Sequence, residues 1–364
     1  MFKDFIFINN TLNSVSKEIT ISLEGCLKFL SKYDTCDRCL NICPNEAIRI
    51  DKKSKHFNIN HSTCSRCGLC TNTCPTGVFE FKYTKFNDLQ NSINSTIKSY
   101  NKIIISCERF SESNDLVDLP YLINIPCIGI LDYALLSHIL LLNPQEFIIY
   151  SDCNKCINKK AYDYFSKLYE EVTDFLSIFN KSNTLLSFKN KFIRTDLNIY
   201  DNKPKEYNSY NLTRRELFKH YKNHFVSTTK KSLSLIKKEQ SDLNRKIDIH
   251  KKILPQRRTL FLNNLKKLEV SESNKILNRS FSFLKSINID YTRCNLCSIC
   301  YILCPTGALT EKSEIDEKGI YRKKGITINH EICINCNFCI NICPKKAITY
   351  RNTIDLSNYR VIHN

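Results

Sequence analysis

Several features that would place this chain in a common class are missing from its sequence. No stretch approaches the about 18 apolar residues of a membrane-spanning helix, and the apolar stretch near the first residue is too short for a secretory signal. There is no G-x-G-x-x-G, no P-loop and no C-x2-C-H motif, which argues against a nucleotide, a flavin or an attached haem. We therefore expect a cytoplasmic protein with no membrane span.

Cysteine, in contrast, is abundant, with 20 residues in a chain of 364. In a short secreted chain this number would predict disulfides. In a long chain without a visible secretory signal, clustered cysteines are more typical of metal ligands, because the cytoplasm keeps thiols reduced. The spacing of these cysteines therefore indicates which metal site they form.

Two identical cysteine patterns lie near the C-terminus, and each reads C-x2-C-x2-C-x3-C-P. The first contains Cys294, Cys297, Cys300 and Cys304, and the second contains Cys333, Cys336, Cys339 and Cys343. The pattern resembles that of bacterial two-cluster ferredoxins, in which three cysteines of a run ligate one [4Fe–4S] cluster and the fourth ligates the other. The resemblance implies a cluster three bound by Cys294, Cys297, Cys300 and Cys343, and a cluster four bound by Cys333, Cys336, Cys339 and Cys304.

Short strands are expected around these runs. Residues 287–289, 325–328 and 347–350 have the β-branched and aromatic content of strands, and Lys318-Gly319 is expected to form a hairpin turn between the runs. Apolar residues between the ligands, such as Leu69, Ile299 and Phe338, are expected to keep water from the clusters.

The N-terminal array is similar but lacks one ligand. Its second run is complete, whereas its first run has Tyr33 where the first cysteine would stand and Cys26 farther upstream. We expect Cys26 to replace the missing ligand. Cluster one would then use Cys26, Cys36, Cys39 and Cys74, and cluster two would use Cys64, Cys67, Cys70 and Cys43. The alternative is that Cys26 is an ordinary buried thiol and that cluster one is a [3Fe–4S] site.

Structural zinc is the alternative for the arrays as a whole. A zinc site usually takes four ligands from two separated C-x2-C pairs. Three cysteines at x2 spacing, followed by x3, a fourth cysteine and proline, suit an iron–sulfur cluster better. The resemblance to two-cluster ferredoxins covers both ends of the chain and implies one-electron transfer.

The middle of the chain has three apolar runs, each of which precedes cysteine. Cys107 follows residues 103–106, Cys127 follows residues 122–126, and Cys153 and Cys156 follow residues 147–150. Helical patterns over residues 129–142 and 157–179 predict parallel strands, whose carboxyl ends meet at one edge of the sheet. We therefore expect the four cysteines to converge there, with Cys127 held as a thiolate at a helix N-terminus.

This segment resembles the small iron–sulfur delta subunits that link hydrogenases to heterodisulfide reductases. The resemblance rests on Cys107, the Pro-Cys-Ile-Gly sequence of residues 126–129, and the Cys153-x2-Cys156 pair. It implies a [2Fe–2S] cluster bound by Cys107, Cys127, Cys153 and Cys156. A redox-active dithiol at Cys153 and Cys156, or four structural thiols, are the alternatives.

A strongly basic segment precedes the C-terminal array. Residues 211–270 carry 16 Lys or Arg and five Asp or Glu, and they supply most of the formal net charge of +18. Residues 212–226, 228–249 and 257–270 have helical patterns. A solvated linker, a docking face for an acidic redox partner, and a nucleic-acid site are the three interpretations, and nucleic acid is the least favoured because no aromatic-interleaved or helix-turn-helix pattern is present.

The sequence thus predicts an α+β architecture in four parts. These are an N-terminal two-cluster module (1–95), a small parallel α/β domain (96–200), a basic helical connector (201–285) and a C-terminal two-cluster module (286–364). The expected function is one-electron transfer between redox enzymes or subunits in anaerobic metabolism. The alternatives are a thiol, disulfide or persulfide reductase that uses the central cysteines, and a nucleic-acid-associated protein with structural clusters.

Overall fold

The computed structural model describes residues 19–31, 36–51, 56–114, 116, 122–181, 184–191, 252–317 and 320–359. All of them belong to one unit of the chain. The helices expected at 212–226 and 228–249, the turn at 318–319 and Tyr33 lie outside the described residues. The described part mixes helices with strands, and its strands form one four-stranded sheet and several two-stranded sheets.

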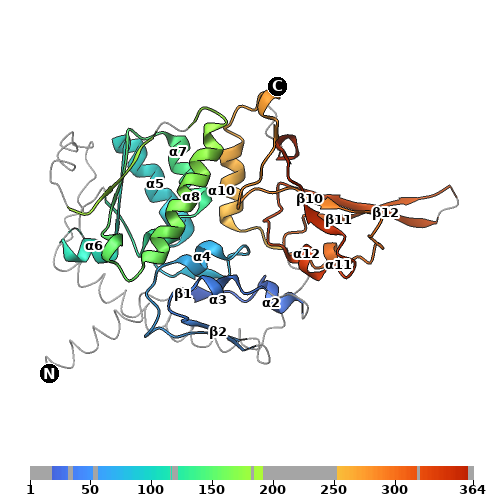
Figure 1. Ribbon diagram of the computed structural model, residues 1–364, viewed down its shortest axis with the longest axis horizontal. Helices are drawn as coiled ribbons and strands as arrows, with labels where there is room; N and C mark the ends of the chain where they lie inside the picture. Colours follow the sequence, from blue (N-terminus) through green and yellow to red (C-terminus); the bar gives the residue numbers. More distant parts are fainter. Residues whose placement is uncertain are drawn as a thin grey trace, which may run out of the picture. The chain divides into compact units, whose positions relative to one another are not determined.

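The N-terminal module is built from two antiparallel strand pairs and three short helices (Figure 1). Strand β1 (Ile19–Ile21) pairs with β4 (Phe79–Phe81), and β2 (Ile48–Asp51) pairs with β3 (His56–Ile59). The helices are α2 (Leu27–Leu30), α3 (Arg38–Ile42) and α4 (Leu69–Thr73). The first strand therefore pairs with the last and closes the module around the cysteine loops.

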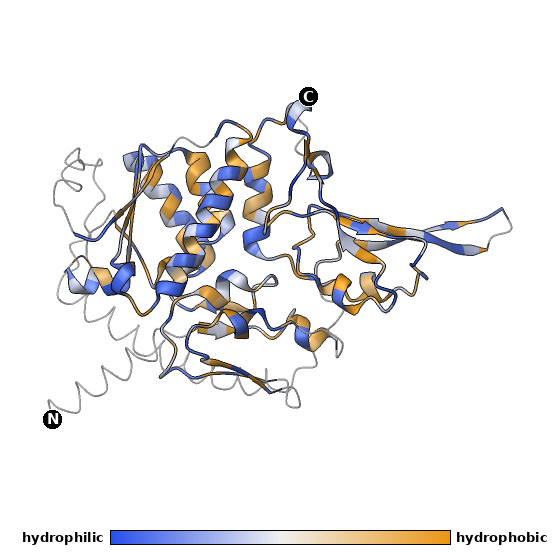
Figure 2. Ribbon diagram, in the orientation of Figure 1, coloured by the Kyte–Doolittle hydropathy of each residue, from blue (hydrophilic) through white to orange (hydrophobic). Residues whose placement is uncertain are grey.

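The C-terminal module repeats this arrangement. Strand β10 (Ile287–Ile289) pairs with β13 (Ile348–Tyr350), and β11 (Leu309–Ile315) pairs with β12 (Tyr321–Ile328). Its helices are α11 (Ile299–Ile302) and α12 (Phe338–Ile342). The β11–β12 hairpin is longer than β2–β3, and its outer part is mostly hydrophilic (Figure 2), with ion pairs such as Lys324–Glu314 across the strands. The strands expected at 287–289, 325–328 and 347–350 are confirmed, although β12 begins earlier.

A parallel sheet occupies the middle of the chain, in the strand order β6-β5-β7-β8. The strands are β5 (Lys102–Cys107), β6 (Leu122–Ile125), β7 (Glu146–Tyr150) and β8 (Leu186–Lys189), and all neighbours are parallel. The three expected strands and their direction are confirmed, whereas β8 was not predicted because its residues are largely exposed and polar.

Helices α5 (Phe86–Tyr100), α7 (Tyr133–Leu142), α8 (Lys159–Ser177) and α10 (Gln256–Leu265) pack together beside this sheet (Figure 1), and the short α6 (Glu108–Ser113) follows β5. Helix α7 contacts both α8 and α10, which explains why its almost wholly apolar sequence is buried. It begins at Tyr133 rather than near Gly129, because the Asp132 carboxylate caps it by accepting the Ala134 and Leu135 N–H groups at 3.0 Å.

The described part of the expected connector is folded into the rest of the unit. Helix α10 packs against α7, and β9 (Ile276–Leu277) pairs with β14 (Ile354–Asp355), which is followed by the 3₁₀ helix η6 (Leu356–Tyr359). Another 3₁₀ helix, η5 (Glu272–Asn274), precedes β9. Residues 252–285 are therefore part of the folded unit, and the interpretation of the basic segment as a solvated linker is wrong for these residues.

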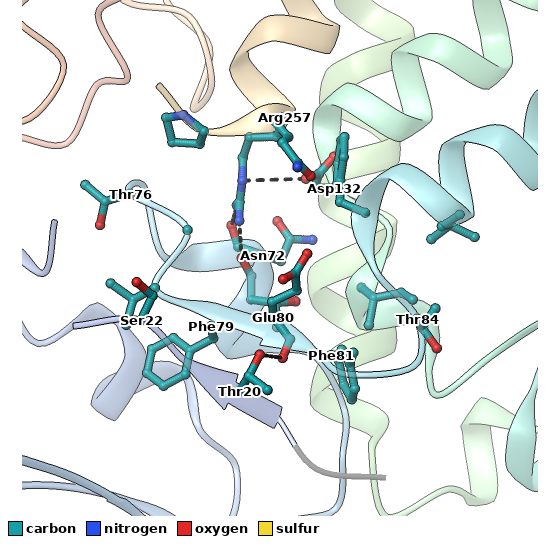
Figure 3. Close-up of a pocket in the computed structure, with 18 of the residues that line it drawn as sticks. Thr20, Ser22, Asn72, Thr76, Phe79, Glu80, Phe81, Thr84, Asp132 and Arg257 are labelled. Carbon is teal, nitrogen blue, oxygen red and sulfur yellow. Dashed lines mark hydrogen bonds and ion pairs between the residues drawn. The ribbon is translucent and has the colours of Figure 1, made fainter. Parts of the chain in front are cut away.

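Two consecutive arginines at the start of α10 join the parts of the unit. Arg257 donates to the carbonyl oxygens of Thr71 and Asn72 at the end of α4, and its Nε lies 3.7 Å from the Asp132 carboxylate (Figure 3). Burial raises the pKa of Asp132, and the Arg257 charge opposes that rise. Arg257 therefore ties α10 to the N-terminal module and to the cap of α7.

Arg258 makes the corresponding contacts with the C-terminal module. Its side chain is only 1% exposed, and it donates to the carbonyl oxygens of Phe283, His330 and Glu331 at 3.4, 2.9 and 2.8 Å. Its guanidinium also lies over the rings of Phe261 and Tyr359. A buried charge is tolerated here because the backbone dipoles of three residues surround it.

In the part of the chain that is described, no helix combines the length and the apolar character needed to cross a lipid bilayer.

Replacing Arg258 with methionine should destabilise the protein strongly. The change keeps most of the side-chain length but leaves three buried carbonyl groups without their donor, so we expect a loss of about 3 kcal/mol or more in the free energy of unfolding. Urea unfolding followed by circular dichroism measures this loss. Arg322→Met is the matched control: Arg322 is exposed and pairs with Asp316 on the hairpin, so its replacement should cost less than about 1 kcal/mol. Equal losses in the two variants would contradict the proposed role of Arg258.

Candidate metal centres

The structure gathers the sixteen cysteines of the two arrays into four groups, which we call cages one to four. The residues that share a cage are those expected to share a cluster. Cage one contains Cys26, Cys36, Cys39 and Cys74; cage two contains Cys43, Cys64, Cys67 and Cys70; cage three contains Cys294, Cys297, Cys300 and Cys343; and cage four contains Cys304, Cys333, Cys336 and Cys339.

Cages one, three and four each surround a small cavity that their thiols line. Cage two is recognised from its electrostatics. Burial raises the pKa of Cys70 most, and the neighbouring Cys67, Cys64 and Cys43 raise it further. The thiols of cage two are therefore close enough for their charges to interact.

The backbone of three cysteine loops is bent in the same unusual way. Left-handed φ angles occur at the second and fourth residues after the first cysteine of each run, at Arg66 and Gly68, at Leu296 and Ser298, and at Asn335 and Asn337. A leucine at φ 55° is costly, so the loop shape is imposed by its surroundings. Alternation of right- and left-handed residues turns successive N–H groups toward one concave side, which is a known binding site for anions and iron–sulfur clusters.

The turns after the fourth cysteines are also alike. Each Cys-Pro turn has a left-handed residue two positions after the proline, at Glu46, Gly77, Gly307 and Lys346. In three of the turns a backbone N–H donates to the cysteine sulfur at 3.3 to 3.4 Å, from Ala47 to Cys43, from Val78 to Cys74 and from Ala347 to Cys343. In iron–sulfur proteins, such bonds to the ligand sulfurs help to set the reduction potential.

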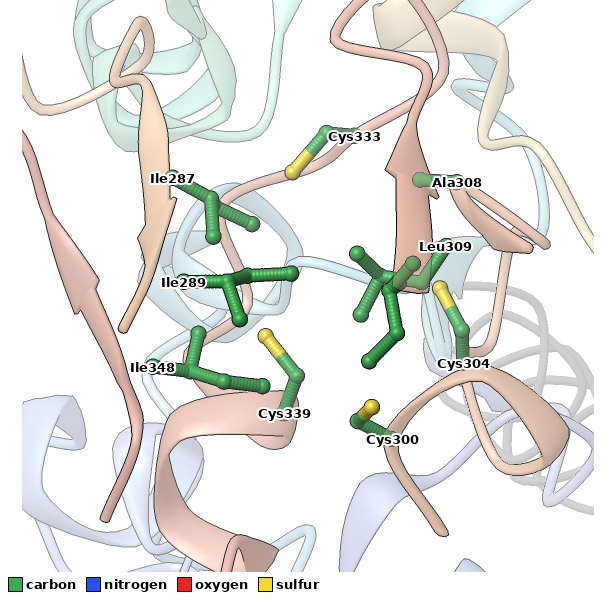
Figure 4. Close-up of a cluster of buried hydrophobic side chains, with 10 residues drawn as sticks. Ile287, Ile289, Cys300, Cys304, Ala308, Leu309, Cys333, Cys339 and Ile348 are labelled. Carbon is green, nitrogen blue, oxygen red and sulfur yellow. The ribbon is translucent and has the colours of Figure 1, made fainter. Parts of the chain in front are cut away.

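Apolar side chains enclose the cages of the C-terminal module. Ile287, Ile289 and Ile348 come from the β10–β13 pair and Leu309 from β11, and they pack with the cysteines of cages three and four (Figure 4). Leu69 and Phe338, expected to exclude water, are fully buried. Ile299 also lines the cavity of cage three, but it is 36% exposed, so this cage lies closer to solvent.

Burial raises the pKa values of many of these thiols. It raises those of Cys26, Cys39 and Cys300 to about 12, with neighbouring thiols adding to the rise. These groups are neutral thiols at pH 7 unless a cation replaces their protons, and metal binding does so. Among the described residues, no three His, Cys, Asp or Glu side chains come close enough together to hold a single metal ion.

Cys26 lies where the missing ligand of cage one would be. It precedes α2, is 7% exposed, and faces the same cavity as Cys36, Cys39 and Cys74. The Lys28 backbone N–H bonds to its sulfur and partly offsets the effect of burial on its pKa. The donor set around cage one is therefore four thiols, as it is around the other cages.

The remaining four cysteines line one pocket, which we call the central pocket. Cys107 ends β5 and Cys127 follows β6; after β7, Cys153 begins the 3₁₀ helix η2 (Cys153–Lys155) and Cys156 follows it. The pocket has a volume of about 310 Å³ and also contains Arg109 and Lys155. It lies at the carboxyl edge of the parallel sheet, where the sequence predicted that these cysteines would converge.

The expected thiolate at Cys127 is wrong. The segment after it is only the short 3₁₀ helix η1 (Ile128–Ile130), and the N-terminus of α7 is already capped by Asp132. Burial raises the pKa of Cys127 to about 12, although the Gly129 N–H lowers it in part. Burial also raises the pKa of Cys153, to about 11. Cys127 and Cys153 are therefore weak nucleophiles at neutral pH.

The central pocket directly adjoins cage two, which the sequence did not predict. The segment 127–131 packs on the cysteine loop so closely that a Cβ atom on Gly129 would lie 2.2 Å from the Cys67 carbonyl oxygen. Asn158 lies between the two sites, and its Nδ2 is 3.3 Å from the Ser65 carbonyl oxygen and 3.8 Å from the Cys127 sulfur. Gly129 belongs to the Pro-Cys-Ile-Gly sequence, but only its contact with Cys67 reveals why a glycine is there.

Comparison with known proteins agrees with this arrangement. The family model for the 4Fe-4S dicluster domain matches residues 34–78 and 293–349. The chain contains two 4Fe-4S dicluster domains. The first match covers the cysteines of cages one and two except Cys26, and the second covers all the cysteines of cages three and four. Both dicluster domains therefore contain two cages each.

The curated relatives with detectable similarity are ferredoxin-type proteins. The ferredoxin-type protein NapF of Escherichia coli strain K12, and those of the O6:H1 and O157:H7 strains, are 29% identical over 86 residues, which is 23% of this chain and 51% of the relative. The chain thus spans about half the length of the curated relatives it matches. No solved structure matches the chain significantly.

Replacing Gly129 with alanine should disturb the contact between the central pocket and the first dicluster domain. The added methyl group would meet a backbone oxygen that cannot move alone, so we expect a loss of about 1–3 kcal/mol in the free energy of unfolding. Gly325→Ala is the control, since its Cβ would lie 3.2 Å from the Tyr291 hydroxyl at the end of a side chain that can shift. Urea unfolding should show that Gly129→Ala is less stable than Gly325→Ala. Equal stability of the two variants would contradict this account of Gly129.

Proposed function

We propose that this protein carries single electrons through four [4Fe–4S] clusters, one in each cage. The observation that carries the proposal is that each dicluster domain supplies two sets of four thiols, with bent loops around them. A bound [4Fe–4S] cluster supplies a one-electron couple, whose potential in ferredoxins is often near about −400 mV. The protein holds each cluster with thiolates, directs N–H groups at the sulfurs and limits access of water.

The ligand sets follow from the cages. Clusters one to four would be bound by cages one to four in turn, including Cys26 in cluster one. Four clusters with a charge of about −2 each would lower the formal net charge from +18 to roughly +10. The loaded protein would still be basic, which supports redox partners with an acidic docking face.

We propose a fifth centre, a [2Fe–2S] cluster, in the central pocket. Its support is the convergence of Cys107, Cys127, Cys153 and Cys156 at one edge of the sheet. The raised pKa values of Cys107, Cys127 and Cys153, caused mainly by burial, agree better with metal ligands than with a reactive dithiol. The size of the pocket nevertheless favours a second candidate function, in which electrons from the clusters reduce a disulfide or persulfide there.

The four-part division of the chain also remains a proposal, with two adjustments. Helix α5 crosses the boundary expected at residues 95 and 96 and packs beside β5, so we assign it to the α/β domain. Residues 252–285 pack on α7 and pair with β14, so we restrict the connector to residues that precede them. We further propose a cytoplasmic location and a role as a carrier or subunit of an oxidoreductase complex in anaerobic metabolism.

Anaerobic purification with iron and sulfide quantitation tests the number of clusters. We expect about 16 irons per chain if the four cages alone are filled, and about 18 if the central pocket also holds a [2Fe–2S] cluster. Low-temperature EPR of the reduced protein should show interacting [4Fe–4S] signals. Four irons or fewer per chain would refute the proposed carrier.

Cys26→Ser tests the unusual ligand of cluster one. If Cys26 is a ligand, the variant should change the signal of one cluster and lower the iron content by about one to four. Cys36→Ser, which replaces a cysteine of the intact spacing in the same cage, is the positive control. Identical iron content and EPR spectra in Cys26→Ser and the natural protein would identify Cys26 as an ordinary buried thiol.

The double substitution Cys153→Ser and Cys156→Ser separates the two roles of the central pocket. We expect it to remove about two irons, because two of the four ligands of the [2Fe–2S] cluster are lost. If the iron content and electron transfer stay unchanged while a disulfide or persulfide reductase activity disappears, the fifth-cluster proposal is wrong and the reductase function is supported.

A further inference from the structure

The two dicluster domains touch each other at particular cages. Arg38 lies between two ligands of cage one, and its Nη2 donates to the Asn335 carbonyl oxygen at 3.3 Å, within the cysteine loop of cage four. These residues are 297 positions apart in the sequence. The contact therefore brings the cysteine loops of cages one and four together.

An apolar cluster surrounds the same contact. Leu27 from α2 packs with Phe338 and Ile342 from α12, and Cys36 and Cys336 both pack against this cluster. Cys36 belongs to cage one and Cys336 to cage four. One cysteine of each cage thus borders a shared, water-poor layer of side chains.

The charge of Arg38 reaches both cages. Its side chain lines the cavity of cage one. On the other side, its guanidinium meets the Asn335 carbonyl oxygen, directly before the cage-four ligand Cys336. A single cation thus lies beside two cages that belong to different domains, where its charge can act on both.

The other cages are neighbours in a definite order. Helix α3, which contains Cys39 of cage one, contacts α4, which contains Cys70 of cage two. Helix α11, with Cys300 of cage three, likewise contacts α12, with Cys339 of cage four. Cage two meets the central pocket where Gly129 packs on Cys67, and Asn158 Nδ2 lies 3.8 Å from the Cys127 sulfur.

We infer that the redox sites form one series, in the order central pocket, cage two, cage one, cage four and cage three, and that Arg38 couples the two domains at the junction of cages one and four. This inference rests on the proposed function, because it requires clusters in the cages. An electron that enters one cluster reduces its iron, and passing to the next reoxidises the first; no covalent bond changes. Arg38 acts as a positioning residue, whose positive charge lies between clusters one and four and stabilises the added electron on either of them.

The ends of the series are the parts open to solvent. Cys297 of cage three is exposed, and Ile299 and Ile302 beside it are 36% and 44% exposed. At the other end the central pocket holds about 310 Å³ of open volume. Cys39 and Cys70 in the middle of the series are buried. Partners would therefore exchange electrons at cage three and at the central pocket.

Potentiometric EPR titration of the full-length holoprotein tests the role of Arg38. In Arg38→Gln we expect the reduction equilibrium constants of two clusters, one and four, to fall about tenfold, equivalent to about 59 mV for a one-electron couple. Clusters two and three should keep their potentials. Arg38→Lys retains the charge and should restore most of the shift. Arg279→Gln is the control for charge, because Arg279 pairs with Asp174 on α8 and lines no cage.

Signals are assigned with Cys36→Ser and Cys336→Ser, which alter a ligand of cluster one and of cluster four respectively. If four clusters assemble and Arg38→Gln shifts none of them, or shifts cluster one alone, the inferred junction is wrong. An equal shift in Arg279→Gln would also overturn it. If the natural protein contains fewer than four [4Fe–4S] clusters, the proposed function fails first, so the two failures can be told apart.

If Arg38→Gln loses iron, the potentials of its clusters cannot be compared, and the test is made on the natural protein instead. Pulsed EPR of partly reduced samples then measures which clusters relax each other magnetically. The inferred order requires the strongest coupling between the domains to join clusters one and four. Stronger coupling between clusters two and three would refute the series.

Discussion

The arrangement of the cysteine cages depends on two guanidinium groups at the start of α10, of which Arg258 is buried and Arg257 is partly buried. Arg257 is bonded to carbonyl groups of the first dicluster domain and lies near the buried Asp132 carboxylate, while Arg258 is bonded to three carbonyl groups of the C-terminal part. Such charges are stable only where oriented dipoles replace water, so the elements that supply those dipoles must keep their positions. Because the arginines are adjacent, both domains are held on one short helix, and the distance between their cages is fixed.

Around each cage, the protein combines local strain with burial. Left-handed residues such as Leu296 cost about 1–2 kcal/mol each, and buried thiols resist ionisation, so the conformation of these loops is unfavourable in two ways. Both costs would be offset by a bound cluster, which accepts N–H groups from the concave loop and takes the thiolates as ligands. Folding of the dicluster domains and cluster binding would therefore be coupled, as in other small metal-binding domains.

The sequence predicted the individual helices and strands better than the contacts between them. The parallel strands β5, β6 and β7 were predicted because continuous apolar runs report burial on both faces of a sheet. Strand β8 and helix α5 were not, since their patterns are more polar and their burial comes from one side only. The segment at 257–258 looked like part of a basic connector, because consecutive arginines usually lie in water. Only the carbonyl groups that meet them, from residues 71, 72, 283, 330 and 331, allow them to leave water.

By itself, the sequence determined the cysteine runs of the two dicluster domains, since ligand spacing within a run is a local property of the backbone; the exchange of the fourth cysteine between runs was implied by the family resemblance. It also indicated where the four central cysteines would meet, because parallel strands end at one edge. Tertiary structure alone decided that cages one and four adjoin through Arg38 and Asn335, that the central pocket adjoins cage two through Gly129 and Asn158, and that burial raises the pKa of Cys127. These features depend on contacts between distant segments and on burial, which no local pattern specifies.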